Sequence, residues 1–263
     1  MALTMGALTG DLAAESAQLN YILAALAEEQ WDLATPAVGW AVRDQVSHLA
    51  YFDEAATLTA TNPARFRAEA SRLMESDRFP DEIAAAYRHL SPRELMDWLA
   101  WTRAEYLRVF SGLEPSSRLA WYGPPMSAAS SVTARLMETW AHGQDIVDAI
   151  GRARRPTARL RHVAHLGVAT RGFSFQLRGQ PVPDAPVRVV LAAPDGSAWE
   201  WGPADAADQV EGPALDFCLL VTQRRHRADT ALRAIGPVAD AWLDLAQAFA
   251  GPPGPGRAPG GGR

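Results

Sequence analysis

Two side chains of the kinds that bind metal ions lie four residues apart in the segment RLMETWAHGQDIVDAIG. They are Glu138 and His142, and apolar residues recur around them at helical spacing until Gly151. We therefore expect a helix that ends near this glycine. Residues at i and i+4 are neighbours on one helix face, so one ion could bind both side chains. The same spacing is also typical of a solvated ion pair on a helix surface, and both alternatives stay open at this point.

His48 is the candidate for a third ligand. It lies in the segment QVSHLAYF, whose apolar residues place it on or beside the inward face of an expected helix. A hydrogen-bonded core histidine is the alternative, because buried polar groups usually find a partner. Two histidines and one carboxylate with open positions would suit a catalytic zinc site. The same set matches the facial triad of non-haem iron enzymes.

Four long amphipathic segments must position these side chains. Their apolar residues recur at helical spacing, and Gly, Pro or Ser-Pro signals bound them. We predict long helices over residues 10–29, 42–60, 91–112 and 130–150, with one or two short helices between 63 and 90. Four long helices with a long connection are typical of a four-helix bundle, which we place at residues 1–155.

The pattern changes after Gly151. The predicted order is a helix over 156–179, a β-hairpin at Asp195-Gly196, β-leaning or ambiguous runs at 215–223 and 230–236, and a closing helix over 237–250. Residues 156–250 should therefore form a small α+β domain, which makes the fold class of the whole chain α+β. The Gly- and Pro-rich tail over 251–263 is expected to be disordered.

The segment TPAVGWAVRDQVSHLAYFDEAA, together with METWAHGQDIVDAIG, resembles the mycothiol-dependent maleylpyruvate isomerase family, within the larger DinB-like group of metal-binding bundles. The resemblance implies that His48, Glu138 and His142 hold one divalent metal, with zinc as the first choice and iron or nickel as alternatives. It also implies a C-terminal domain similar to sterol-carrier folds. Relatives often cap the second helix with Ser or Thr where this chain has Ala41, so the cap must come from elsewhere or be weak. The matching residues are Trp40, Val42, Arg43, Asp44, His48, Leu49, Glu138, His142 and Asp145.

Three further residues are candidates for the reaction site. Asp145 lies one turn after His142 and could orient it, or it could be a helix-surface charge. Asp53 follows His48 on the same helix and could reach the site. The resemblance also implies a Gly-Arg pair after an apolar segment of the second domain, and the arginine of this pair is associated with thiol binding. In this chain the corresponding pair is Gln223-Arg224. Arg224 is therefore the candidate for binding mycothiol, with a solvated basic turn as the alternative.

Composition narrows the class of protein. The sequence contains no lysine, which excludes Schiff-base chemistry, a pyridoxal phosphate anchor and a Walker A lysine. A net charge of −5 argues against nucleic acid or an anionic membrane as the main partner. No apolar run is long enough to span a bilayer, and the N-terminus does not resemble a secretory signal. A single cysteine, Cys218, fits a reducing compartment, so we expect a cytoplasmic protein.

The expected function is that of a metal-dependent isomerase or thiol transferase. Mycothiol would be the cosubstrate, and a small electrophilic metabolite would be the substrate. Two alternatives stay open: a metal-dependent hydrolase or lyase that uses no thiol, and a non-catalytic protein that binds a metal or a ligand. A homodimer is also left open by the sequence.

Overall fold

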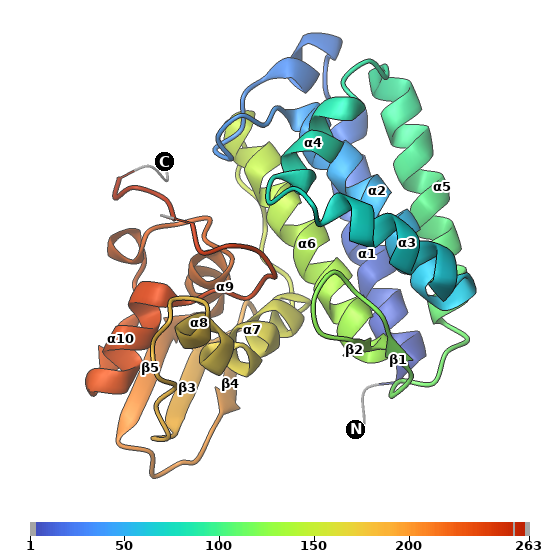
Figure 1. Cartoon of the computed structure of the whole chain (residues 1–263). Helices are drawn as coiled ribbons and strands as arrows, with labels where there is room; N and C mark the ends of the chain where they lie inside the picture. Colours follow the sequence, from blue (N-terminus) through green and yellow to red (C-terminus); the bar gives the residue numbers. More distant parts are fainter. Residues whose placement is uncertain (1–3, 255, 261–263) are drawn as a thin grey trace. The chain divides into compact units, whose positions relative to one another are not determined.

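Four long helices form the N-terminal unit, which spans Met1–Ala153. The computed structural model describes residues 4–254 and 256–260 of the chain. Leu19, Leu49, Leu95 and Ile146, one from each long helix, are buried together in the core. The long helices are α1 (Met5–Ala24), α2 (Val42–Thr61), α5 (Pro92–Phe110) and α6 (Ala128–Ala149). Helix α2 packs against α5 and α6, and α1 packs against α6 (Figure 1).

Local capping explains where these helices begin. Helix α1 begins earlier than predicted because the Thr4 hydroxyl accepts the Ala7 N–H at 3.2 Å. Helix α2 follows Ala41, whose side chain cannot cap; instead the Asp44 carboxylate accepts the Ala41 N–H at 2.8 Å. The cap therefore does come from elsewhere. Helix α5 begins with Ser91, Pro92 and Glu94 in a capping box, as the Ser-Pro signal indicates.

Shorter elements connect the long helices. The first helix ends at Ala24, five residues before its predicted end, and a 3₁₀ turn, η1 (Glu28–Asp32), follows it. Two short helices, α3 (Pro63–Leu73) and α4 (Phe79–Ala86), occupy the connection where one or two were predicted. A two-stranded hairpin of β1 (Arg118–Leu119) and β2 (Met126–Ser127) precedes α6 and was not expected.

The second unit, Arg154–Arg263, has a four-stranded sheet in the order β4-β3-β5-β6. The expected hairpin at Asp195-Gly196 is confirmed, because β3 and β4 pair in antiparallel register on either side of it. Its strands are β3 (Val187–Ala192), β4 (Ala198–Trp201), β5 (Asp208–Pro213) and β6 (Arg233–Ile235). Its helical elements are α7 (Leu160–Ala169), α8 (Arg171–Gln176), α9 (Ala214–Val221), η2 (Arg227–Asp229) and α10 (Pro237–Leu245). The α+β fold class is thereby confirmed.

Three features of this unit differ from the expectation. The single helix expected over 156–179 is two helices, α7 and α8, which meet at Thr170. The ambiguous run at 215–223 is helical over most of its length, in α9. This helix is buried on nearly all sides, so its sequence has no amphipathic period that would distinguish helix from strand. Strand β5 was not predicted at all, and it pairs in parallel with β3.

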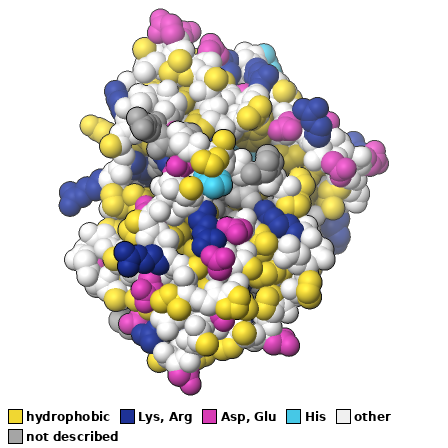
Figure 2. Space-filling view, turned by 90° about the vertical axis from the view of Figure 1, so that its left-hand side faces the viewer, with side chains coloured by type: hydrophobic (Ala, Val, Ile, Leu, Met, Phe, Trp, Pro, Cys, Tyr) yellow, Lys and Arg dark blue, Asp and Glu magenta, His cyan; other side chains and the backbone are white. Residues whose placement is uncertain are grey.

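The tail contains neither helix nor strand over residues 251–254 and 256–260. Within it, the Gly260 N–H donates to the Asp229 carboxylate at 2.9 Å. The expected disorder of the tail stays a prediction, and for residues 255 and 261–263 it lies outside the described part of the chain. No helix among the described residues is both long and apolar enough to cross a membrane. On the face drawn in Figure 2, arginine and acidic side chains are interspersed.

Candidate metal centre

The structure brings His48, Glu138 and His142 together. Helix α2 carries His48, and α6 carries the other two side chains one turn apart. The Oε2 atom of Glu138 lies 3.0 Å from Nε2 of His142 and 3.6 Å from Nε2 of His48. One ligand atom from each residue lies within 4.8 Å of the other two. Glu138 and His142 are therefore not a solvated surface pair, since their side chains are only 21% and 10% exposed.

A hydrogen-bond chain fixes the orientation of the His142 ring. Its Nδ1 atom lies 2.5 Å from Oε1 of Gln45, whose Nε2 donates to Thr35 at 2.8 Å. The Thr35 hydroxyl in turn donates to the Trp40 carbonyl at 2.8 Å. Since the Gln45 amide nitrogen is engaged with Thr35, its oxygen accepts from Nδ1–H of His142. Nε2 of His142 is then the ring atom that faces Glu138, and it is the atom that would bind a metal ion in place of its contact with that carboxylate.

Gln45 was not among the residues expected at the site. It lies three positions before His48 on α2, so it shares a helix face with that ligand, which is the only signal that could have revealed it. Asp145, the residue expected to orient His142, is fully buried. The His142 Nδ1 contact goes to Gln45. A role for Asp145 at the site stays a prediction.

His48 lies between two aromatic rings. The ring centroids of Trp40 and Phe52 lie 5.2 Å and 4.5 Å from that of His48. The His48 Nδ1 atom is buried and has no hydrogen-bond partner among the described residues. Its Nε2 atom is therefore the ring atom that interacts with the other two candidate ligands.

Burial and proximity set the protonation of the site. Burial, with a further effect of His142, lowers the pKa of the His48 imidazole from 6.5 to about 4. Burial opposes ionisation of Glu138, but the neighbouring imidazoles of His142 and His48 outweigh it and hold the pKa of this carboxyl well below its usual value. A neutral His48 beside an ionised Glu138 is the combination that metal binding needs.

This donor set fits a divalent metal ion. Imidazole nitrogen and carboxylate oxygen are both ligands of zinc, and three protein ligands leave a coordination position open, as in catalytic rather than structural zinc sites. Among the described residues, no other group of three metal-binding side chains is this close together. His162 and His165, which are also close in sequence, do not form such a group within that part of the chain.

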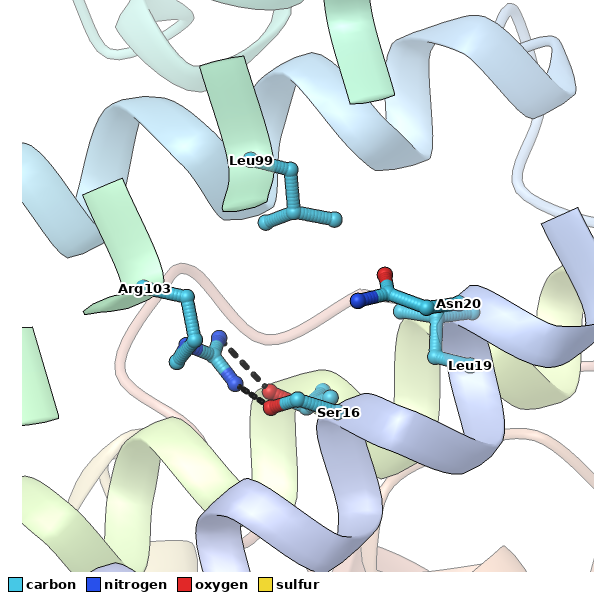
Figure 3. Close-up of a pocket in the computed structure, with 6 residues that line it drawn as sticks. Ser16, Leu19, Asn20, Leu99 and Arg103 are labelled. Carbon is cyan, nitrogen blue, oxygen red and sulfur yellow. Dashed lines mark hydrogen bonds between the residues drawn. The ribbon is translucent and has the colours of Figure 1, made fainter. Parts of the chain in front are cut away.

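Asp53 lies in a buried ionic network and not among the three candidate ligands. Its carboxylate accepts from Arg103 at 2.5 and 3.1 Å and from Arg135 Nε at 2.9 Å. Arg103 also donates to Ser16 of α1 and to Thr139 of α6 (Figure 3). The network thus ties all four long helices together. That Asp53 takes part in the reaction stays a prediction, and its three arginine contacts favour a structural role.

The cavity drawn in Figure 3 lies beside Arg103 and is also lined by Ser16, Leu19 and Leu99. Its volume of about 10 Å³ corresponds to one water molecule. It is therefore too small to be a substrate site.

Arg224 belongs to the second unit, in the turn that ends α9. The preceding Gln223 has φ of 58°, a left-handed conformation that favours glycine. The Arg224 N–H donates to the Leu219 carbonyl at 2.7 Å, and its guanidinium donates to the Thr222 carbonyl at 2.6 Å. The turn therefore keeps the backbone that a Gly-Arg pair would adopt, although glutamine stands where the resemblance implies glycine.

A four-helix bundle that gathers two histidines and a glutamate at one point has the arrangement from which helix bundles build metal sites. A family model described as "Mycothiol maleylpyruvate isomerase N-terminal domain" matches residues 12–147, and one described as "Wyosine base formation" matches residues 183–234. The chain therefore belongs to the mycothiol maleylpyruvate isomerase N-terminal domain family, which confirms the resemblance inferred from its motifs.

Relatives and solved structures match nearly the whole chain. Two uncharacterised proteins of Mycobacterium tuberculosis, from strains H37Rv and CDC 1551, are each 45% identical to it over 254 residues, which is 96% of this chain and 98% of theirs. Crystal structures of the mycothiol-dependent maleylpyruvate isomerase and of a histidine-to-alanine mutant share 15% identity, with TM-scores of 0.59 and 0.60. Each covers 88% of this chain and 93% of its own. At this identity the likeness establishes the fold.

Proposed function

We propose that this protein is a divalent-metal-dependent enzyme that uses mycothiol to isomerise or conjugate a small electrophile. The observation that carries the proposal is the convergence of His48 Nε2 and His142 Nε2 on one oxygen of Glu138, with all three ligand atoms within 4.8 Å of one another. Membership of the isomerase family supports the thiol and the reaction type.

The residues of the site would divide the work. His48, Glu138 and His142 would hold the ion, which when bound would stabilise the thiolate form of a thiol at neutral pH. Gln45 keeps the His142 ring in place, and the rings of Trp40 and Phe52 limit the access of water to His48.

The fate of a thiol adduct would decide the product. Addition of the thiol to an activated double bond, rotation and elimination would give an isomer, whereas retention of the adduct would give a conjugate. Arg224 would bind oxygen atoms of the thiol or of the substrate through its planar guanidinium.

Zinc is the metal we propose, since two imidazoles and one carboxylate are common ligands of catalytic zinc. Iron and nickel are the alternatives that metal analysis would distinguish. The buried cysteine and the thiol cosubstrate suit a reducing compartment, so a cytoplasmic location is part of the proposal. The homodimer stays a prediction.

Metal analysis of purified variants tests the site. We expect one metal ion per wild-type chain after dialysis against a weak chelator, and a sharp loss of metal in His48→Ala, Glu138→Ala and His142→Ala. His162→Ala is the matched control, because it removes a histidine outside the group, and it should keep its metal. Full metal occupancy in His48→Ala would refute the interhelical site.

The thiol requires a second measurement. Metal-loaded protein should bind mycothiol, and mycothiol should be required for the conversion of an electrophile with an activated double bond. Metal binding without thiol affinity would overturn the thiol-dependent reaction and favour a metal-dependent hydrolase or a binding protein.

A further inference from the structure

We propose that the electrophile taken by this site is an aromatic or otherwise apolar molecule, and not a small dicarboxylate. The inference rests on the proposed function, because it concerns the substrate that meets the metal-bound thiol. Aromatic side chains on one side of the candidate metal centre carry the argument, and we call them the aromatic rim. The aromatic rim comprises Trp40, Phe52, Phe79, Trp121 and Tyr122.

The inner part of the aromatic rim touches the metal ligands themselves. Trp40 lies beside both imidazoles: its centroid is 5.2 Å from that of His48, to which it is tilted by 57°, and 5.9 Å from that of His142, to which it is nearly parallel at 17°. Phe52 lies 4.5 Å from His48. A substrate bound at the ligands would therefore lie close to aromatic surface, where apolar and aromatic groups bind well.

The outer part of the aromatic rim comes from two connecting segments. Phe79 begins α4, while Trp121 and Tyr122 lie in the loop between β1 and β2. The ring centroid of Phe52 lies 6.4 Å from that of Phe79, 6.3 Å from that of Trp121 and 5.6 Å from that of Tyr122. These three side chains are only partly buried, whereas Phe52 is 6% exposed. The aromatic rim therefore presents ring surface to solvent beside ligands that are themselves 10–21% exposed.

A specific hydrogen bond holds the rim residue nearest to both imidazoles. The Trp40 Nε1–H donates to Oδ1 of Asp81 on α4 at 2.8 Å. This bond satisfies the polar atom of the indole and fixes the plane of its ring. The apolar face of Trp40 is thus held in place before any ligand arrives, which favours binding because less freedom is lost.

Four arginines on or bonded to α2 and α6 do not favour a dicarboxylate. Four arginines lie on α2 and α6 or bond to α2, and each has a carboxylate partner: Arg43 pairs with Asp32, Arg88 with Asp44, and Arg103 and Arg135 with Asp53. A substrate carboxylate that bound to these arginines would have to compete with their partners. An aromatic ring faces no such cost.

Ligands that share one metal-binding group can separate these preferences. We would measure binding to the zinc-loaded full chain by calorimetry for benzohydroxamate, acetohydroxamate and succinate monohydroxamate, each corrected for its affinity for free zinc. They differ in carrying a phenyl ring, a methyl group or a carboxylate arm. Benzohydroxamate should bind about tenfold more tightly than acetohydroxamate, given the apolar area that a phenyl ring buries. The carboxylate arm should bring no gain.

Variants locate the preference on the aromatic rim. Tyr122→Ala removes an outer ring, and Asp81→Ala frees the Trp40 ring without removing apolar surface, so both should reduce the phenyl preference by about threefold or more. Trp101→Ala is the matched control, because Trp101 is 61% exposed on α5 and belongs to no part of the rim, and it should change nothing. Metal content is measured for every variant, so a lost metal is not mistaken for a lost ring contact.

Each outcome decides between the proposals. A phenyl preference that falls by about threefold or more in Tyr122→Ala and in Asp81→Ala, but not in Trp101→Ala, supports the inference, and a preference that stays unchanged in both rim variants overturns it. Metal-loaded protein that binds the phenyl and methyl ligands equally, or that prefers the carboxylate arm, overturns the inference and leaves the metal site intact. Wild-type protein that binds no metal overturns the proposed function and the inference with it.

Discussion

Replacing Asp53 by asparagine should strongly destabilise the N-terminal unit while leaving the metal ligands in place. The Asp53 carboxylate is fully buried and is the partner of both Arg103 and Arg135, which are themselves buried. Asparagine keeps the shape of the side chain but removes its charge and places an amide donor against the guanidinium groups. Two buried positive charges would then lack their shared partner.

The expected magnitude follows from that loss. Removing one partner of a buried ion pair costs about 3–5 kcal/mol, because the remaining charge stays desolvated. This is a large share of the roughly 5–15 kcal/mol that stabilises a typical domain. A domain of this size loses roughly 2–4 °C in melting temperature for each kcal/mol, so we expect a decrease on the order of 10 °C.

Chemical denaturation followed by helical circular dichroism provides the assay, because the N-terminal unit holds the long helices. Glu54→Gln is the matched control: it removes a neighbouring but exposed carboxylate of α2 and should stay within about 0.5 kcal/mol of the wild type. Replacing Asp53, Arg103 and Arg135 together by apolar residues of similar size should restore much of the lost stability. An Asp53→Asn protein that is as stable as the wild type, keeps its metal and loses turnover would instead make Asp53 a residue of the reaction.

Three other predictions address separate parts of the chain. Cys218→Ala should leave turnover intact, because the thiol is fully buried and burial raises its pKa; lost turnover in a folded, metal-loaded variant would contradict this. Arg224→Ala should mainly raise the KM for mycothiol, since it removes a binding contact and not a reacting group, and an unchanged KM would remove the case for its role. In metal-free protein, an NMR titration should give His48 a pKa near 4. Between pH 6.5 and about 4 the unfolded chain binds a proton at His48 that the folded chain does not. The free energy of unfolding should therefore fall by roughly 3 kcal/mol as the pH drops through this range. A His48 titration midpoint near 6.5 would show that burial has no such effect.

The sequence was most informative where local pattern and structure agree. The apolar spacing of α2 and α6 predicted both helices to within two residues at their beginnings, and these helices carry all three candidate ligands. Residue type made His48, Glu138 and His142 candidates for metal ligands, and the family resemblance then implied that the three bind one ion. The Ser91-Pro92 signal located α5 for the same reason: a cap depends on neighbouring residues alone.

The elements that were missed depend on contacts between distant residues. Strand β5 has little apolar alternation, and it forms because it pairs with β3 about twenty residues earlier and with β6 about twenty residues later. Helix α9 is buried on nearly every side, so its continuous apolar run does not distinguish helix from strand. Gln45 escaped notice because a glutamine on a helix is common, and only the position of His142 on another helix shows what it does.

The two halves of the proposed chemistry lie on different kinds of structure. The candidate ligands and Gln45 lie on long helices that buried ion pairs and a shared apolar core hold in place. Phe79, Trp121 and Tyr122 of the aromatic rim lie at the start of a short helix and in a hairpin loop, and Trp121 and Tyr122 pack against a small buried cluster separate from the core around the ligands. A change in the loop can therefore alter which electrophile binds without moving the metal ligands. This division explains how one bundle can keep a metal centre while its substrate changes, and it makes the loop between β1 and β2 the segment in which substrate preference should be sought.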